Sequence, residues 1–217
     1  MNPSSDGPAS AAETGFPVPR DAAPHPSTPL ELVVLAGKRV ADAILRTQLA
    51  NAELVEAARQ LDVVAAQLDE GALEHSTIVK ELRAWRRMPE HDPASGARNM
   101  MAPPLKMHGD GPRKMVGQVT LDYLYQGPAG YAHGGISALI LDHALGVTNG
   151  WAGKVGVTGT LTLRYHQLTP LCTPLTVHTE CVSVDGRKIR TVGRIEHEGG
   201  TCVSAEGLFI EPRGLRG

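Results

Sequence analysis

Apolar and small residues recur at helical spacing in the first half of the chain. From residue 28 to about Asp69 they follow intervals of three and four in two runs, at Val33, Gly37, Val40 and Ile44, and at Leu54, Ala58, Leu61, Ala65 and Leu68. The start at Thr28-Pro29-Leu30-Glu31 fits a capping box with Thr28 as the N-cap. The pattern predicts one long helical segment that Gly71 ends.

A second amphipathic helix is expected at about 73–87, where Ile78, Leu82 and Trp85 share one face. We expect the two helices to form a hairpin that packs on the main domain or on a partner subunit. The alternative is a regulatory or membrane-surface role for the Arg-rich end of this helix.

The second half of the chain changes to strand periodicity. After Gly117, apolar side chains alternate with polar ones, so that Val119, Leu121, Tyr123 and Tyr125 share the core face of one strand. An apolar helix is expected at about 134–150, and further strands at 155–168, 174–184, 187–197 and 201–211. The order of one strand, one helix and consecutive antiparallel strands predicts an α+β fold, with the helix against a curved antiparallel sheet.

Four regions follow from these patterns and from the composition between them. Pro-rich residues 1–27 predict a disordered tail. Residues 28–88 form the N-terminal helical segment, and residues 89–114 are a linker or a site-covering loop without periodicity. Residues 115–217 form the main domain.

Charge and cysteine content exclude several classes of function. The net charge is -2 without a basic stripe, so nucleic acid is not an expected partner. No apolar run reaches the roughly 18–20 residues of a membrane span, and the N-terminus does not read as a secretory signal. Three cysteines without a CxxC pair support neither a disulfide framework nor a structural zinc site. We expect a cytoplasmic protein.

The candidate chemistry lies where a Gly-rich loop carrying His133 meets the predicted helix. That helix is apolar at Ile136, Leu139 and Ile140, yet it carries the acid Asp142. A lone carboxylate in such surroundings indicates chemistry, unless it pairs with a neighbouring side chain such as His143 or Arg164. Backbone N–H groups at a helix N-terminus stabilise negative charge. Together these are the parts needed to cleave an ester or thioester.

The motif His133-Gly134-Gly135-x-x-Ala138-x-x-x-Asp142, in this order of elements, resembles the hotdog-fold acyl-CoA thioesterases. The match is best with the branch that includes the phenylacetate-pathway thioesterases and the human THEM group, and it covers roughly residues 115–211. The resemblance implies a hotdog fold, thioester hydrolysis without metal or organic cofactor, a place in fatty acid metabolism, and a homodimer or homotetramer.

The resemblance also implies roles for individual residues. Asp142 would be the general base or nucleophile, Gly134 would donate its backbone N–H to the thioester carbonyl, and His133 would shape the loop. Thr158 would lie near the attacking water. The candidate substrate-binding residues are Gly135, Gln126, Thr160 (second choice for the water position) and Arg164. Candidates to hold the CoA phosphates are Arg164, Arg187, Lys188 and Arg190.

The spacing of the motif has a consequence for assembly. Asp142 is eight residues beyond Gly134, which at 1.5 Å per residue is roughly 12 Å along a helix. One helix therefore cannot bring both groups to one bond, and an isologous dimer with two composite sites is expected. Two alternatives are weighed against the thioesterase: a hotdog-fold enoyl-CoA hydratase, whose longer signature is not found, and a non-catalytic acyl-CoA-binding regulatory module.

Overall fold

The structure is a computed structural model that describes residues 28–74, 76–77 and 88–213. The predicted disordered tail at 1–27 and most of the predicted helix at 73–87 lie outside these residues. The described elements are α1 (Pro29–Arg46), α2 (Asn51–Asp69), α4 (Met88–His91), β1 (Lys106–Gly109), β2 (Lys114–Thr120), the 3-10 helix η1 (Tyr123–Tyr125), α5 (Gly134–Trp151), β3 (Val157–Tyr165), β4 (Pro174–Asp185), β5 (Lys188–His197) and β6 (Gly200–Ile210). Within the described residues, no helix has the length and apolarity to cross a membrane.

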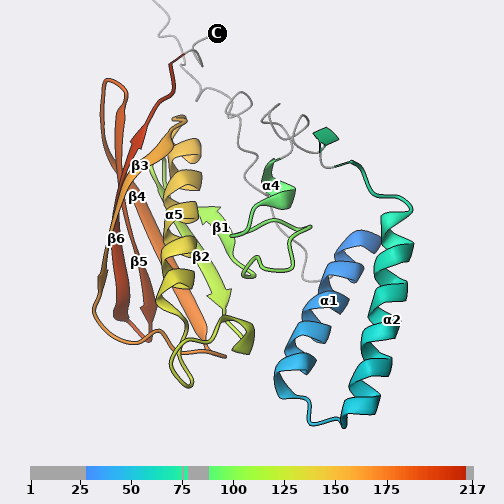
Figure 1. The fold of residues 1–217 in the computed structure, drawn as a ribbon. Coiled ribbons are helices and arrows are strands. Elements are labelled where there is room, and N and C mark those ends of the chain that lie inside the picture. Colours follow the sequence, from blue (N-terminus) through green and yellow to red (C-terminus); the bar gives the residue numbers. More distant parts are fainter. Residues whose placement is uncertain (1–27, 75, 78–87, 214–217) are drawn as a thin grey trace, which may run out of the picture.

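One antiparallel sheet of six strands in the order β1-β2-β4-β5-β6-β3 forms the main layer. Helix α5 lies against one face of this curved sheet, and β3 forms one edge of it (Figure 1). The predicted hotdog fold, with one apolar helix against an antiparallel sheet, is confirmed. The helix expected at about 134–150 and the four strands after it all form close to their predicted positions.

The core lies between α5 and the sheet. Fully buried side chains come from both layers, namely Ile140, Leu141 and Leu145 of α5 and Leu175, Val177, Ile189, Ile195 and Phe209 of the sheet. Each such side chain contributes about 1.5–3 kcal/mol. Two glycines of the sheet face Leu145 of α5, whose methyl carbons lie 3.0 Å and 3.1 Å from where a Cβ at Gly193 or Gly207 would be, and atoms of the sheet itself lie closer still. The glycines therefore let the helix approach the sheet closely.

The predicted single helix at 28–69 is wrong, because it divides into α1 and α2. The capping box at Thr28 forms as predicted. However, Thr47 is extended (ψ 145°) and accepts a hydrogen bond from the Leu49 N–H, while the Glu53 carboxylate accepts one from the Ala50 N–H. These local bonds end one helix and start the next without a Gly or Pro. Helices α1 and α2 form a hairpin (Figure 1), and the second helix predicted at 73–87 lies mostly outside the described residues.

Helix α1 attaches the hairpin to the main domain. Lys38 donates from Nζ to the Ala102 carbonyl (2.5 Å), which also accepts from the Tyr125 hydroxyl (2.9 Å). Burial lowers the pKa of Lys38, and the charge of Asp122 opposes this shift. The sulfur of Met100 takes the place that a Cβ would need at Gly37. Neither α1 nor α2 has a fully buried residue.

Two predictions around the first strand are wrong. Residues 89–114, expected to lack periodic structure, include β1, which pairs with β2. The strand expected after Gly117 ends at Thr120, and 123–125 form η1, where the Asp122 carboxylate accepts from the Leu124 N–H (3.0 Å). The tighter turn leaves Tyr125 buried as predicted but turns Tyr123 out, 50% exposed.

Candidate active site

His133 sets the start of α5 as its N-cap. Its Nδ1 accepts a hydrogen bond from the Gly135 N–H (3.0 Å), and its carbonyl accepts from the Ile136 N–H (2.9 Å). Its own N–H donates to the Tyr125 carbonyl (2.8 Å), which fixes the loop to η1. Because Nδ1 is an acceptor, the neutral ring carries its proton on Nε2. His133 is therefore a capping residue with one remaining donor at the exposed mouth of the loop.

The amide of Gly134 is left available by this arrangement. Gly134 is the first residue of α5, where an N–H has no acceptor within the helix. The amides of Gly135 and Ile136 are already bonded to His133, and within the described residues Gly134 has no such partner. Its N–H lies at the positive end of the helix dipole, where an oxyanion is stabilised.

Tyr165 of β3 lies against the same turn, a contact that the sequence analysis did not predict. Its hydroxyl donates to the Gly134 carbonyl (3.0 Å). A cleft of about 380 Å³ opens here and is lined by Pro128, Ala132, Gly134, Ser137, Tyr165, His166, Gln167, Leu168 and Thr169. The sequence did offer one indication of this contact, because Tyr165 alternates with Leu161 and Leu163 and therefore shares their face of the strand. The cleft therefore holds the predicted oxyanion donor.

Asp142 and Thr158 are brought together at the other end of β3. The Thr158 hydroxyl donates to Asp142 Oδ1 (2.9 Å), and Asp142 is half-buried. The alternative partners of Asp142 lie elsewhere: His143 pairs with Asp92, and Arg164 faces the other side of the sheet. The carboxylate thus keeps one oxygen free of a protein donor within the described part of the chain.

A bulge at Gly159 decides which residues of β3 face α5. The register with β6 shifts between Thr158 and Thr160, which pair with Phe209 and Leu208. In a regular strand two residues an odd number apart would point to opposite faces. Because of the bulge, Thr158 and Tyr165 both face α5 although they are seven residues apart. Thr160, the second choice, falls on the opposite face.

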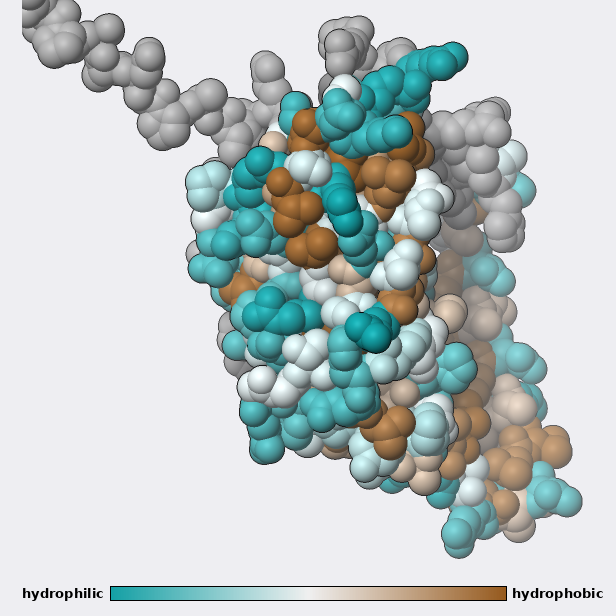
Figure 2. Space-filling view, turned by 90° about the vertical axis from the view of Figure 1, so that its left-hand side faces the viewer, coloured by the Kyte–Doolittle hydropathy of each residue, from teal (hydrophilic) through white to brown (hydrophobic). Residues whose placement is uncertain are grey.

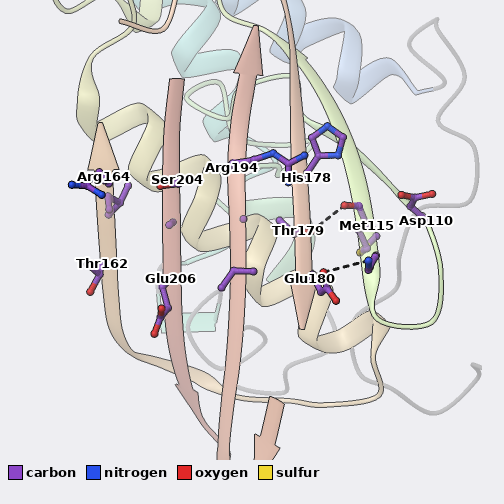
Figure 3. A pocket seen from close by; sticks show the side chains of 15 residues that line it. Asp110, Met115, Thr162, Arg164, His178, Thr179, Glu180, Arg194, Ser204 and Glu206 are labelled. Carbon is purple, nitrogen blue, oxygen red and sulfur yellow. Dashed lines mark hydrogen bonds and ion pairs between the residues drawn. The ribbon is translucent and has the colours of Figure 1, made fainter. Parts of the chain in front are cut away.

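The outer face of the sheet carries a larger cleft, of about 570 Å³. Arg164 lies there beside Thr162 and Glu206, in front of strands that separate it from α5 (Figure 3). The predicted substrate-binding residue Arg164 is therefore not placed with Asp142. This face is mixed in polarity, with teal and brown side chains interspersed (Figure 2), and its charges largely pair with one another.

Three other residues predicted to bind the substrate or the CoA phosphates form hydrogen bonds or ion pairs with nearby residues of the chain. Gln126 Oε1 accepts from the Gly130 N–H (3.4 Å) and so helps to close the Gly-rich loop. The Arg187 Nε donates to the Glu211 carbonyl (2.8 Å), and Arg190 pairs with Glu206 (2.7 Å). Neither arginine is beside Gly134 or Asp142.

A further contact reaches α5 from the predicted linker. Asp92 pairs with His143, 3.3 Å between Oδ1 and Nδ1, one residue after Asp142. It also accepts from the N–H groups of Ala94 (2.7 Å) and Ser95 (3.2 Å). Burial acts to raise the pKa of Asp92, but the hydrogen bond and charge of His143 and the two amides together bring it below its usual value. No sequence pattern indicated this pair.

The fold and sequence are similar to known proteins. The family model described as Thioesterase superfamily matches residues 129–204. A solved thioesterase superfamily protein is 42% identical, with 85% of this chain and 96% of that one covered and a TM-score of 0.77. Thioesterase superfamily member 2 from zebrafish is 14% identical, with coverage of 65% and 100% and a TM-score of 0.50. A hypothetical thioesterase from Streptococcus pneumoniae, solved with coenzyme A, is 21% identical, with coverage of 49% and 86% and a TM-score of 0.47.

Proposed function

Because this chain belongs to the thioesterase superfamily, we propose that it hydrolyses an acyl-CoA thioester to the free acid and coenzyme A. The observation that carries the proposal is the pairing of Thr158 with Asp142 on the helix whose first amide, at Gly134, is available. The reaction needs an acid–base group and a donor for the carbonyl oxygen, and both are present on α5. Neither a metal nor an organic cofactor is required for this chemistry.

Asp142 acts as the general base in this proposal. The Thr158 hydroxyl holds Oδ1, which leaves Oδ2 to take a proton from water. That water adds to the carbonyl carbon, and the Gly134 N–H stabilises the negative charge that develops on the carbonyl oxygen. When the tetrahedral intermediate collapses, the carbon–sulfur bond breaks, the leaving thiolate takes up the proton held by Asp142, and the free acid and the thiol are released. Thr158 acts through Asp142 and is a positioning residue.

Two copies are needed to assemble this site. Asp142 and Gly134 are roughly 12 Å apart along α5. Asp142 is bonded to Thr158 at one end of β3, and Gly134 to Tyr165 at the other end. Strand β3 is an edge of the sheet and offers unpaired backbone groups to a second copy. An antiparallel two-fold pairing of β3 would bring the Thr158 end of one copy to the Tyr165 end of the other. Asp142 of one copy would then complete the cleft at Gly134 of its partner.

Thiol release from a panel of acyl-CoAs tests the activity. With Asp142→Asn we expect turnover to fall by about 10²–10⁴, the value of a positioned base, with an unchanged circular dichroism spectrum. The substrate preference of the wild type then gives the acyl class. Binding of acyl-CoA without thiol release by the wild type would sink the proposal and favour a non-catalytic binding module. Unimpaired turnover by Asp142→Asn would exclude Asp142 as the base.

Mixing two inactive variants tests the composite site. Asp142→Asn and Gly134→Pro each damage both sites of a homodimer, but a mixed dimer has one site with both groups intact. After subunit exchange at equal amounts, half of the dimers are mixed, so activity should return to about a quarter of wild type. If each site lay within one chain, mixing would restore nothing.

A further inference from the structure

The α1–α2 hairpin carries an apolar surface that the main domain does not cover. On α2, apolar residues alternate at intervals of three and four, at Leu54, Ala57, Leu61, Val64 and Leu68. This is the a/d spacing of helices that pack side by side. The four large members of this α2 stripe are between 39% and 51% exposed, and α2 buries no residue at all.

A helix of this kind needs a partner. Most helical stability in proteins comes from packing an apolar face, and α1 and α2, of 18 and 19 residues, bury no residue in this way. Helix α1 has no buried residue either, and it exposes Leu32, Ile44 and Leu45 by 55–60%. The hairpin is therefore helical while many of its large apolar residues still face solvent.

The charges indicate which partner fits. Helix α1 has three basic and two acidic side chains, a net of +1, whereas α2 has one basic and four acidic side chains, a net of -3. Two α2 helices side by side would repel each other, but α2 of one copy against α1 of a second copy is complementary. Such a contact is isologous, because each copy contributes the same two helices.

We propose that the hairpin is a self-association surface on which a second copy of this chain packs its own hairpin, as a four-helix bundle with α2 of each copy against α1 of the other. The hairpin lies beyond β1 and β2, whereas β3 is the opposite edge of the sheet (Figure 1). The bundle is therefore a different contact from the one through β3, and the two together give a dimer of dimers. The proposal of this bundle rests on the α1–α2 hairpin alone and does not depend on the proposed enzyme activity.

Adjacent valines provide a matched pair of variants. Val64 belongs to the α2 stripe, whereas Val63 is one residue away on the polar side of the same helix, and the two are 50% and 59% exposed. Val64→Glu places a charge in the proposed contact. Val63→Glu makes the same chemical change outside it. Both variants leave every residue of the proposed active site untouched.

Sedimentation of the full chain at tens of micromolar is the test. We expect the wild type and Val63→Glu at about 92 kDa, four times 23.0 kDa, and Val64→Glu at about 46 kDa. Thiol release per chain should be equal in all three, so a failure of the proposed enzyme activity would not affect this result. A wild-type dimer that Val64→Glu converts to a monomer would support the bundle and show that the β3 contact does not form, whereas a monomeric wild type would overturn the proposal. An unchanged mass of Val64→Glu would also overturn it, whether or not that variant melts at a lower temperature, since the stripe would then pack within its own chain.

Discussion

Gly134→Pro isolates the contribution of one backbone N–H. Proline is favoured at the first position of a helix, where the missing N–H breaks no helical bond. The preceding residue, His133, has ψ 134°, within the range of about 120–160° that proline requires of its neighbour. The capping bond from the Gly135 N–H to His133 and the bond from Tyr165 to the Gly134 carbonyl use atoms that proline keeps. The change therefore removes the proposed oxyanion donor and spares the helix.

The expected magnitude follows from the role of the donor. Loss of one oxyanion donor costs about 10²–10³ in kcat, or about 2.7–4 kcal/mol of transition-state stabilisation. Gly134→Ala is the control, because it adds a Cβ and keeps the N–H. That Cβ would lie 3.3 Å from both Cε1 and the hydroxyl oxygen of Tyr165, an exposed ring that can shift by a few tenths of an ångström. Alanine should therefore lose much less activity than proline.

The assay is steady-state thiol release by the wild type, Gly134→Pro and Gly134→Ala, with thermal melting of each variant to verify the fold. Loss of a donor that acts on the developing oxyanion lowers kcat, whereas loss of a ground-state contact raises KM. If the proline variant stays within tenfold of the alanine variant in kcat, the Gly134 amide is not the oxyanion donor and the proposed geometry is wrong.

Three further changes test the surroundings of the site. Thr158→Val removes the hydroxyl bonded to Asp142, the proposed base, and should lower kcat by about tenfold to a hundredfold, while Thr158→Ser should retain most of it in the same thiol-release assay. The pKa of Asp92 is lowered in the folded state, so the carboxylate stabilises the fold above its ordinary pKa of 3.8, and this stabilisation is lost as pH falls through its pKa in the folded protein. In urea denaturation between pH 6 and 2.5, the free energy of unfolding should therefore fall less steeply with acid for Asp92→Asn than for the wild type. Tyr125→Phe removes the hydroxyl bond to the Ala102 carbonyl and should lower the free energy of unfolding by about 0.5–1.5 kcal/mol in urea. Burial, and to a lesser degree Asp122, raises the pKa of Tyr125 to about 12, so wild-type stability should also decline between about pH 10 and 12, and less so in the phenylalanine variant.

The features that could be predicted from the sequence are those encoded over short distances. The capping box at Thr28 and the helix that starts after His133 each depend on a few neighbouring residues, and each forms. The break at residues 47–50 could not be predicted, because side chains of ordinary helix-compatible types terminate α1 there. Strand β1 was missed because it is short and mostly exposed, so no apolar alternation marks it.

Long-range contacts within the site needed the structure. The pair Asp92–His143 joins segments about fifty residues apart, and no periodicity links them. The choice between Thr158 and Thr160 as the neighbour of Asp142 depends on one extra residue in β3. Alternation alone, counted from Tyr165 towards the start of the strand, would have turned Thr158 away from α5. Gly159 was the signal that the sequence offered, since an isolated glycine in a strand often marks a bulge.

That bulge also gives the strongest structural reason to regard β3 and α5 as one functional unit. Without it, Tyr165 could contact Gly134 while Thr158 pointed to the outer face, and Asp142 would lose its hydroxyl donor. With it, a single strand meets α5 at both ends, with a hydroxyl at each, 2.9 Å from Asp142 and 3.0 Å from the Gly134 carbonyl. The two ends are too far apart to act on one bond, so in the proposed mechanism each copy presents two half-sites along one edge strand. A two-fold pairing along that edge is the arrangement in which both half-sites of both copies are used.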